Sequence, residues 1–332
     1  MSEKIMTLPS LKSRKRLMKT SATTNAHYGK PPGQRTVREL LHNGCITLDK
    51  PAGPTSHQVV AWVKEMLELE KAGHGGTLDP AVTGILPVAL GDAARALQVL
   101  LVAGKEYVAL MRLHKEVDEK KIREVCESFV GEISQIPPLR SAVKRVRRTR
   151  EVYYLEILEI QGREVLFRVG CEAGTYIRTL CVDMGKKLGS GAQLMELRRT
   201  RVGNITEDSA VSLQDLKDAF VFWKEDGEEE GVRKTILPME RLLEVVPKIV
   251  VRDSAVDALC HGANLAIPGV VELDEMTAGE IAAVLSLKGE GVALVKMEIP
   301  SLQVIEKDTG ICASLERVLM NKGTYPSIWK KT

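Results

Sequence analysis

The sequence predicts an α+β fold in which a mixed, largely antiparallel sheet flanked by helices precedes a small β-barrel. Strand-like and helix-like stretches follow one another in no regular alternation, which argues against a doubly wound parallel sheet. From Pro247 to about Ile311, short strands and tight glycine turns predominate, as in small barrels. The 332 residues are 44% apolar and 27% charged, enough for two or three domains. We divide the chain into an N-terminal arm (1–35), a large domain (36–246), a smaller domain (247–322) and a C-terminal tail (323–332).

The large domain begins with a strand, a capped helix and two buried stretches. A short apolar strand at 45–48 precedes a helix that Thr55 or Ser56 caps. Apolar residues then recur at helical spacing as far as Leu67. The segments predicted to be buried by their pattern are 85–90 and 94–102.

The remaining elements follow from the same periodicities. We expect a short amphipathic helix at 118–129, which the segment Gln135-Ile136-Pro137-Pro138 separates from the basic run that follows. A second helix follows Gly174, with apolar residues at helical spacing from Ile177 to Leu188. The predicted strands are 107–113, 152–160 and 164–171, and a hairpin of 282–287 with 292–298.

Basic residues are concentrated in two parts of a chain whose net charge is only +3. The arm is polar and basic and ends in the turn-rich segment 29–33, so it is either an arm that docks on another surface or a disordered solubilising tail. Residues 140–150 hold six basic residues and no acid, whereas 225–230 is acidic. This clustering predicts a polyanion bound at one place, with a solvated charged face as the alternative.

Cysteine and histidine spacing favours no metal site. None of the six cysteines forms a Cys-x-x-Cys pair, so we expect reduced, mostly buried thiols. The six histidines show no spacing typical of metal ligands, and we expect neither a metal nor another cofactor. The sequence shows no membrane-length apolar run and no signal-peptide core, which predicts a cytoplasmic protein.

The most informative stretch is the glycine-rich run Gly73–Gly84, which contains a single aspartate, Asp79, followed by Pro80. Glycine allows a ligand to approach the backbone closely, so this loop predicts one carboxylate presented to a bulky partner. The alternative is that Asp79 merely caps a helix that begins at Pro80.

Two other stretches contain polar and aromatic residues that suit a site. Lys105–Val108 opens a strand and includes Tyr107, while Gly174–Leu180 places Tyr176 and Arg178 at a strand-to-helix junction, where ligands often bind. Taken singly, each residue is better explained without a site, Tyr107 as a core aromatic of a strand and Arg178 as a member of a surface ion pair.

Together these stretches resemble the successive motifs of the TruB-like family of pseudouridine synthases. The resemblance covers roughly residues 40–245 and includes Leu48-Asp49-Lys50-Pro51 with Gly53 and Thr55-Ser56 as the N-terminal motif. The other motifs, in family order, are Gly73–Gly84, Lys105–Val108, Gly174–Leu180 and Leu197–Thr200.

Further details resemble the guide-dependent branch of this family, the archaeal counterpart of dyskerin. Its marks are Pro80–Gly84, Pro137–Lys144 and Tyr153–Leu158. The C-terminal unit is similar to a PUA domain, an RNA-binding barrel, in His261–Gly269 and the Lys288–Glu290 turn. Because the chain lacks the long lysine-rich tails of eukaryotic members, we expect an archaeal form.

The resemblance implies a chemistry for each motif. A pseudouridine synthase breaks the N1 glycosidic bond of a uridine, turns the base and rejoins it through C5, and one ionised carboxylate, here Asp79, suffices. Attack on C1′ and proton removal from C2′ both remain open. By the same resemblance Arg178 would keep Asp79 ionised and oriented, and Tyr107 would stack on the flipped base. Tyr176 would lie on the other side of the base and Leu197 would close the apolar wall.

RNA contacts are also implied for several basic residues. His74 corresponds to a position that contacts the target RNA loop, with a turn-stabilising role as the alternative. Phosphate contact is expected for the basic residues Lys144, Arg145, Arg147, Arg148, Arg198, Arg199 and Lys288.

The predicted function is therefore the catalytic subunit of an H/ACA guide-RNA ribonucleoprotein that isomerises chosen uridines of ribosomal RNA. The implied partners are guide RNA, substrate RNA, two small accessory proteins and a kink-turn-binding protein, with no membrane and no homo-oligomer required. One alternative is a guide-independent enzyme acting on the tRNA T-loop. The others are a non-catalytic RNA-binding assembly factor and an aspartate-nucleophile hydrolase, for which no partner acid stands in a recognisable motif. The sequence does not identify the target uridines.

Overall fold

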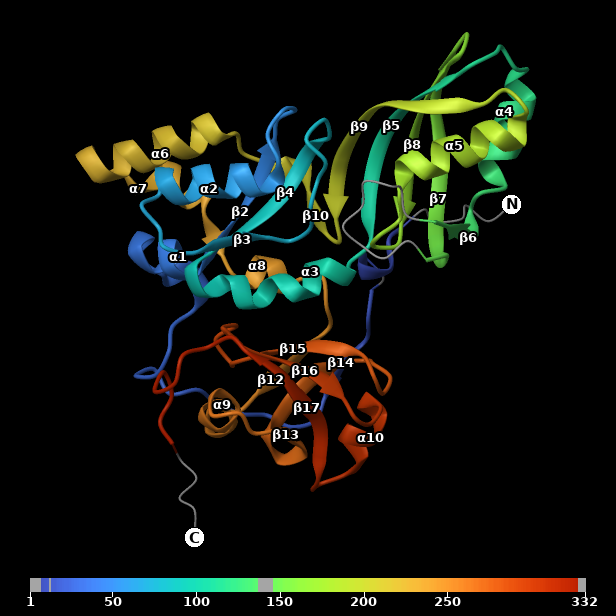
Figure 1. Ribbon diagram of the computed structural model, residues 1–332. Helices are drawn as coiled ribbons and strands as arrows, with labels where there is room; N and C mark the ends of the chain where they lie inside the picture. Colours follow the sequence, from blue (N-terminus) through green and yellow to red (C-terminus); the bar gives the residue numbers. More distant parts are fainter. Residues whose placement is uncertain (1–6, 12, 137–145, 328–332) are drawn as a thin grey trace.

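Two β-sheets organise the protein, whose computed structural model describes residues 7–11, 13–136 and 146–327 (Figure 1). The ten-stranded sheet contains, in spatial order, β11 (Leu237–Pro238), β2 (Gly44–Lys50), β4 (Thr83–Leu90), β9 (Ala192–Val202), β5 (Lys105–Leu113), β8 (Glu164–Cys171), β7 (Arg148–Gln161) and β6 (Gly131–Gln135). The two short strands β3 (Ala72–His74) and β10 (Ile205–Thr206) pair with β4 and β9.

The larger sheet consists of two halves that meet where β4 lies beside β9. These two strands pair in parallel through only two residue pairs, Thr83 with Arg198 and Gly84 with Arg199, whereas the sheet's other described pairings are antiparallel. Gly84 has a φ of +100°, and a Cβ there would lie 2.2 Å from the Arg199 carbonyl oxygen. Only glycine therefore permits this close approach of backbones. We call the β4–β9 junction the seam.

Helices pack on both faces of the β2–β4 half of this sheet and on one face of the other half. The helix α2 (Ser56–Met66) begins with a capping box in which Thr55 accepts a hydrogen bond from Gln58, so Thr55 is the cap and Ser56 the first helical residue. α5 (Ile177–Leu188) and α4 (Glu119–Glu127) pack their apolar stripes on the β5–β8–β7 half, as their spacing predicted. The other α-helices beside this sheet are α1 (Val37–Asn43), α3 (Gln98–Val102), α6 (Leu213–Asp226), α7 (Glu229–Thr235) and α8 (Glu240–Leu243).

The second sheet curls around a core of its own below the first (Figure 1). Its spatial order is β1 (Arg16–Met18), β14 (Val270–Asp274), β12 (Lys248–Val251), β15 (Ile281–Leu285), β16 (Gly291–Met297), β17 (Ile311–Val318) and β13 (Leu265–Ala266), with α9 (Asp253–Cys260) and α10 (Ser301–Glu306) beside it. The predicted β15–β16 hairpin is confirmed. The predicted fold class, a mixed sheet with helices and a C-terminal β domain, is confirmed as well.

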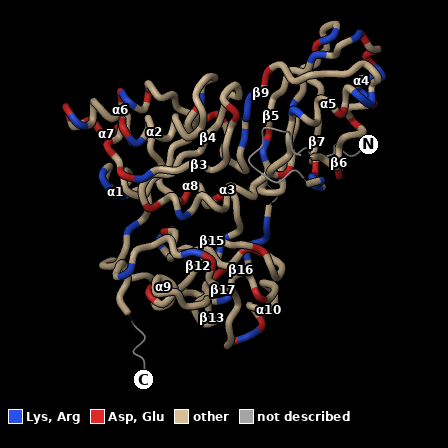
Figure 2. The backbone as a smooth tube through the Cα atoms, in the orientation of Figure 1, with Lys and Arg blue, Asp and Glu red and all other residues tan. Residues whose placement is uncertain are grey.

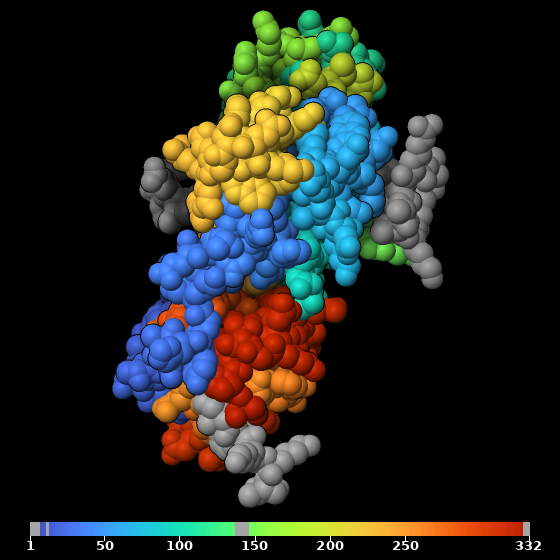
Figure 3. Space-filling view, turned by 90° about the vertical axis from the view of Figure 1, so that its left-hand side faces the viewer, coloured from blue at the N-terminus to red at the C-terminus, as the bar shows by residue number. Residues whose placement is uncertain are grey.

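The N-terminal arm docks on this second sheet. Its strand β1 pairs antiparallel with β14, so the first described strand of the chain completes a sheet formed by the last third. Figure 3 shows the blue N-terminal residues lying against the orange and red C-terminal part. Of the two interpretations of the arm, the docked one holds for β1.

One expectation about an individual element needs correction, and two strands were missed. Segment 94–102 is not buried to its end, because Leu101 and Val102 are 55% and 72% exposed. The strands β6 and β9 were not predicted, since charged and polar residues interrupt their apolar pattern. No helix among the described residues is both long and apolar enough to cross a membrane.

Candidate active site

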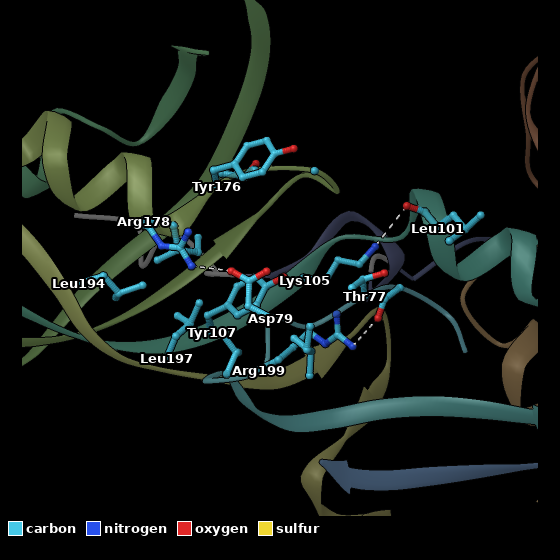
Figure 4. Close-up of a pocket in the computed structure, with 16 residues that line it drawn as sticks. Thr77, Asp79, Leu101, Lys105, Tyr107, Tyr176, Arg178, Leu194, Leu197 and Arg199 are labelled. Carbon is cyan, nitrogen blue, oxygen red and sulfur yellow. Dashed lines mark hydrogen bonds and ion pairs between the residues drawn. The ribbon is translucent and has the colours of Figure 1, made fainter. Parts of the chain in front are cut away.

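A cavity of about 480 Å³ lies at the seam and is lined by residues from both halves of the sheet (Figure 4). One side is the loop between β3 and β4, which contributes Gly76–Asp79 and Val82. The other side is built from β5, β9 and the start of α5, which contribute Tyr107, Leu197 and residues 174–178. The structure thus brings together Asp79, Tyr107, Tyr176, Arg178 and Leu197, which sequence reasoning assigned to one site.

The backbone around Asp79 forms a turn rather than the start of a helix. The Val82 N–H donates to the Asp79 carbonyl at 3.0 Å, and the chain enters β4 at Thr83. The alternative in which Asp79 caps a helix at Pro80 is therefore wrong. The Asp79 side chain is 58% exposed and lines the cavity.

Buried side chains from the N-terminal motif hold this turn from behind. The Ser56 hydroxyl, fully buried, accepts a hydrogen bond from Leu78 N–H at 2.9 Å and donates to the Leu78 carbonyl at 3.1 Å. The ammonium of Lys50, also fully buried, donates to the Pro80 carbonyl at 3.1 Å, which the Gly53 N–H also reaches at 2.9 Å. Both neighbours of Asp79 are thereby fixed. Burial lowers the pKa of Lys50, and the nearby charge of Asp79 opposes that shift.

Arg178 forms an ion pair with Asp79 across the cavity. Its Nη2 lies 2.5 Å from Asp79 Oδ2 (Figure 4). Arg178 is in the first turn of α5, whose buried stripe packs on the neighbouring half of the sheet. The pair therefore joins the two halves and orients the carboxylate.

Beneath the pair, Tyr107 and Arg199 face each other from paired strands. Burial raises the pKa of the Tyr107 hydroxyl, and the adjacent Arg199 guanidinium opposes that shift. Arg199 is only 1% exposed and donates to the carbonyls of Ile85 at 2.8 Å and Gly76 at 3.1 Å. The prediction that Arg199 contacts RNA from the surface is thus wrong, because its guanidinium is used inside the protein to hold the glycine-rich loop.

The other basic residues predicted to contact RNA lie in different surroundings (Figure 2 shows Lys and Arg in blue). Lys144 and Arg145 lie outside the described residues, Arg147 is exposed and Arg148 half-buried. Arg198 is bound on both sides, to Asp49 at 2.9 and 3.0 Å and to Glu207 at 2.6 Å. Lys288 donates to carbonyls of the N-terminal arm, Asn25 at 2.9 Å and Gly29 at 3.3 Å among them. The predicted phosphate contact of Lys288 stays a prediction, and the structure shows its ammonium bound to the arm.

His74 lies outside the cavity lining, at the end of β3. Its ring packs edge-on against His57, with centroids 5.0 Å apart, and burial lowers its pKa. Within the described part of the chain, its buried Nδ1 has no hydrogen-bond partner. No group of three or more potential metal ligands occurs among the described residues.

Comparison with known proteins now gives the family. Residues 64–177 match the N-terminal domain of TruB family pseudouridylate synthases, and residues 178–244 match the C-terminal domain of tRNA pseudouridylate synthase B. A probable tRNA pseudouridine synthase B of Pyrococcus abyssi is 57% identical over 310 residues, 93% of each chain. The chain belongs to the TruB family of pseudouridine synthases. A probable tRNA pseudouridine synthase B of Methanopyrus kandleri is 54% identical over 323 residues, covering 97% of this chain and 96% of that one.

This TruB family member also carries two accessory domains. Residues 6–60 match the DKCLD domain and residues 247–319 the PUA domain, so the resemblance to a PUA domain is confirmed. A chain from a Cbf5-Nop10-Gar1 complex superimposes with a TM-score of 0.94 at 54% identity, covering 97% of this chain and 98% of that chain. A chain from an H/ACA RNP bound to a substrate RNA containing 2′-deoxyuridine gives 0.92 at 52%, covering 97% and 100%. These matches confirm the dyskerin-like branch predicted from the sequence.

Proposed function

We propose that this protein is the catalytic subunit of an H/ACA guide-RNA ribonucleoprotein and isomerises uridines of ribosomal RNA to pseudouridine, with Asp79 as the reactive carboxylate. The observation that carries the proposal is the full-length similarity to a chain found in an H/ACA RNP with substrate RNA. The proposed partners are a guide RNA, a substrate RNA, counterparts of Nop10 and Gar1 and a kink-turn-binding protein. Six free, buried cysteines support a cytoplasmic location.

The geometry of the cavity supports this reaction class. Asp79 is the carboxylate at the cavity, and the Arg178 fork holds one of its oxygens at 2.5 Å, which leaves the other oxygen for the ribose. Tyr107 forms part of the cavity wall below that carboxylate, where an extracted base would stack on its ring. Leu197 and Val82 supply apolar surface for the same base.

The net reaction balances without water or a redox partner. The N1–C1′ bond of uridine breaks, a C5–C1′ bond forms, and the proton on C5 leaves while N1 gains one. Asp79 either bonds to C1′ in between or removes a proton from C2′ and returns it. Both routes need the carboxylate held toward the ribose, and the ion pair with the Arg178 guanidinium orients it.

The test is a single-turnover assay on RNA carrying tritium at C5 of uridine, since isomerisation releases that tritium to water. Asp79→Asn should abolish release while guide-RNA binding is retained. Asp92→Asn is a matched control, because Asp92 forms an ion pair with Arg95 at 2.9 Å that is also exposed but lies outside the cavity. Release by Asp79→Asn at the rate of the control would overturn the proposed role.

A second candidate is guide-independent modification of the tRNA T-loop. The names of the curated relatives, probable tRNA pseudouridine synthase B, favour it. Purified protein is assayed on an unmodified tRNA transcript and on a ribosomal RNA segment, each with and without guide RNA and accessory proteins. Turnover of the ribosomal segment only with the guide supports the first function, and turnover of the tRNA alone supports the second.

A further inference from the structure

We infer that Gln135 is a positioning residue for the reaction, which sets Tyr176 and the start of α5 against Asp79 through two hydrogen bonds to the Tyr176 backbone. The inference rests on the proposed function, because it concerns the same cavity. Gln135 is the last residue of β6 and is 3% exposed.

The two ends of the Gln135 amide bind one residue of the backbone. Its Oε1 accepts a hydrogen bond from the Tyr176 N–H at 3.0 Å, and its Nε2 donates to the Tyr176 carbonyl at 3.1 Å. The side chain thus acts as a neighbouring strand would, with one acceptor and one donor at the correct spacing. Such a paired contact fixes orientation as well as distance.

At Tyr176 this contact acts on the start of α5. Tyr176 is the N-cap of α5, with non-helical backbone angles of φ −94° and ψ 103°, and its own side chain makes no capping hydrogen bond. The first N–H groups of a helix have no partner within the helix, so an external acceptor contributes to where the helix begins. Arg178, the partner of Asp79, is two residues further on.

The loop that leads to Tyr176 is held at its other end by the same hairpin. β6 pairs with β7, and Glu151 of β7 accepts a hydrogen bond from the Glu172 N–H at 2.8 Å. Between these two contacts lies Gly174 with a φ of +81°, a conformation that suits glycine. The β6–β7 hairpin therefore supports both ends of the segment that forms one wall of the cavity, and Gln135 supports the end nearest to the chemistry.

The structure offers a matched control for loss of such a contact. The Ser301 hydroxyl, fully buried at the start of α10, accepts from the Met276 N–H at 2.9 Å and donates to the Met276 carbonyl at 3.2 Å. Ser301→Ala removes the two side-chain hydrogen bonds to Met276 far from the cavity, while the Met276 carbonyl keeps its hydrogen bond from the Ser301 N–H at 3.0 Å. Its effect separates general destabilisation from a specific effect on the site.

The experiment compares the complete ribonucleoprotein containing wild-type protein, Gln135→Met, Gln135→Glu or Ser301→Ala in the tritium-release assay. For Gln135→Met we expect kcat to fall about 10- to 100-fold, as for a small displacement of a positioned group, with KM nearly unchanged. Ser301→Ala should retain the wild-type rate at a temperature where it is folded. Equal rates for Gln135→Met and Ser301→Ala would overturn the inference.

Gln135→Glu supplies a readout that a merely structural role would not move. A protonated carboxyl has the same shape as the amide and the same acceptor and donor, whereas the ionised form repels the Tyr176 carbonyl. The ratio of its rate to the wild-type rate should therefore rise about tenfold as pH falls from 8 to 6. A ratio that is flat with pH would overturn the inference, even if Gln135→Met failed to fold. If wild type itself released no tritium, the proposed function would fail instead.

Discussion

Removing the Ser56 hydroxyl should loosen the turn that presents Asp79. In Ser56→Ala the Leu78 N–H and carbonyl lose their partner inside the protein, where Leu78 is 4% exposed. An unpartnered buried polar group costs about 1–3 kcal/mol, so the two together cost about 2–4 kcal/mol after partial relaxation. If about 1.4 kcal/mol of that falls on ordering the turn in the transition state, the rate drops about tenfold.

Two measurements separate the stability effect from the catalytic one. Urea unfolding gives the loss of stability, and single-turnover tritium release gives the rate of the chemical step. Ser301→Ala is the control, since it removes two side-chain hydrogen bonds to Met276, which follows β14 in the C-terminal domain. Ser56→Ala should lose at least as much stability as Ser301→Ala, because the Met276 carbonyl keeps the Ser301 N–H as a donor, and only Ser56→Ala should lose rate. If Ser56→Ala matched the control in stability and kept the full rate, the hydroxyl would not order the turn and the reasoning would be refuted.

Three further predictions concern the seam, the arm and the first helix. Gly84→Ala should lower the free energy of unfolding by more than about 3 kcal/mol, because the added Cβ would lie 2.2 Å from the Arg199 carbonyl oxygen. Gly53→Ala is the control: Gly53 has a φ of +112° but open space around it, so the loss should be only about 1 kcal/mol, and urea unfolding of the two variants compares the losses. Lys288→Met should speed proteolysis within residues 25–29, because the carbonyls that its ammonium binds are released, and an unchanged cleavage rate would contradict this. Hydrogen bonding from Lys30 lowers the pKa of the Glu39 carboxyl from 4.5 to about 2, so the stabilisation that this carboxylate contributes is present above pH 4.5 and is lost as pH falls through 2. Glu39→Gln should therefore lower the free energy of unfolding by about 1 kcal/mol at pH 7, discounted for exposure, and leave it unchanged well below pH 2.

Elements set by local pattern could be predicted from the sequence. The cap at Thr55 is local, because Gln58 is three residues away and completes the capping box. The apolar stripe of α5 was also readable, since its buried residues recur at helical spacing. β9 was not, because Arg198 and Arg199 stand side by side in a strand that partly faces the interior. Their partners come from β2, β4 and the glycine-rich loop, which no local pattern indicates.

The candidate site was predictable in its members but not in its supports. Asp79 and Arg178 are 99 residues apart in sequence, and only the resemblance to a known family placed them together before the structure did. Ser56 was considered only as part of a motif and as a possible helix cap, and Gln135 only as part of a segment that breaks a helix. Their partners lie 22 and 41 residues away. Because such contacts join a side chain to backbone groups, which every residue type has, the sequence does not indicate which residues pair.

These supports share a physical reason. A cavity that must admit a nucleotide leaves the segments around it without packing on one side, so their conformation has to be fixed from the other side. Ser56 holds Leu78, Gln135 holds Tyr176 and Arg199 holds Gly76, each from a buried side chain that binds backbone polar groups. Apolar packing alone would fix position less sharply, because it is not directional. The cost of burying polar side chains is offset only when their hydrogen bonds are made, which ties the loop conformation to the folded core. The segments around the cavity are therefore fixed by hydrogen bonds on the side that faces the sheet, and their other side is left for the nucleotide.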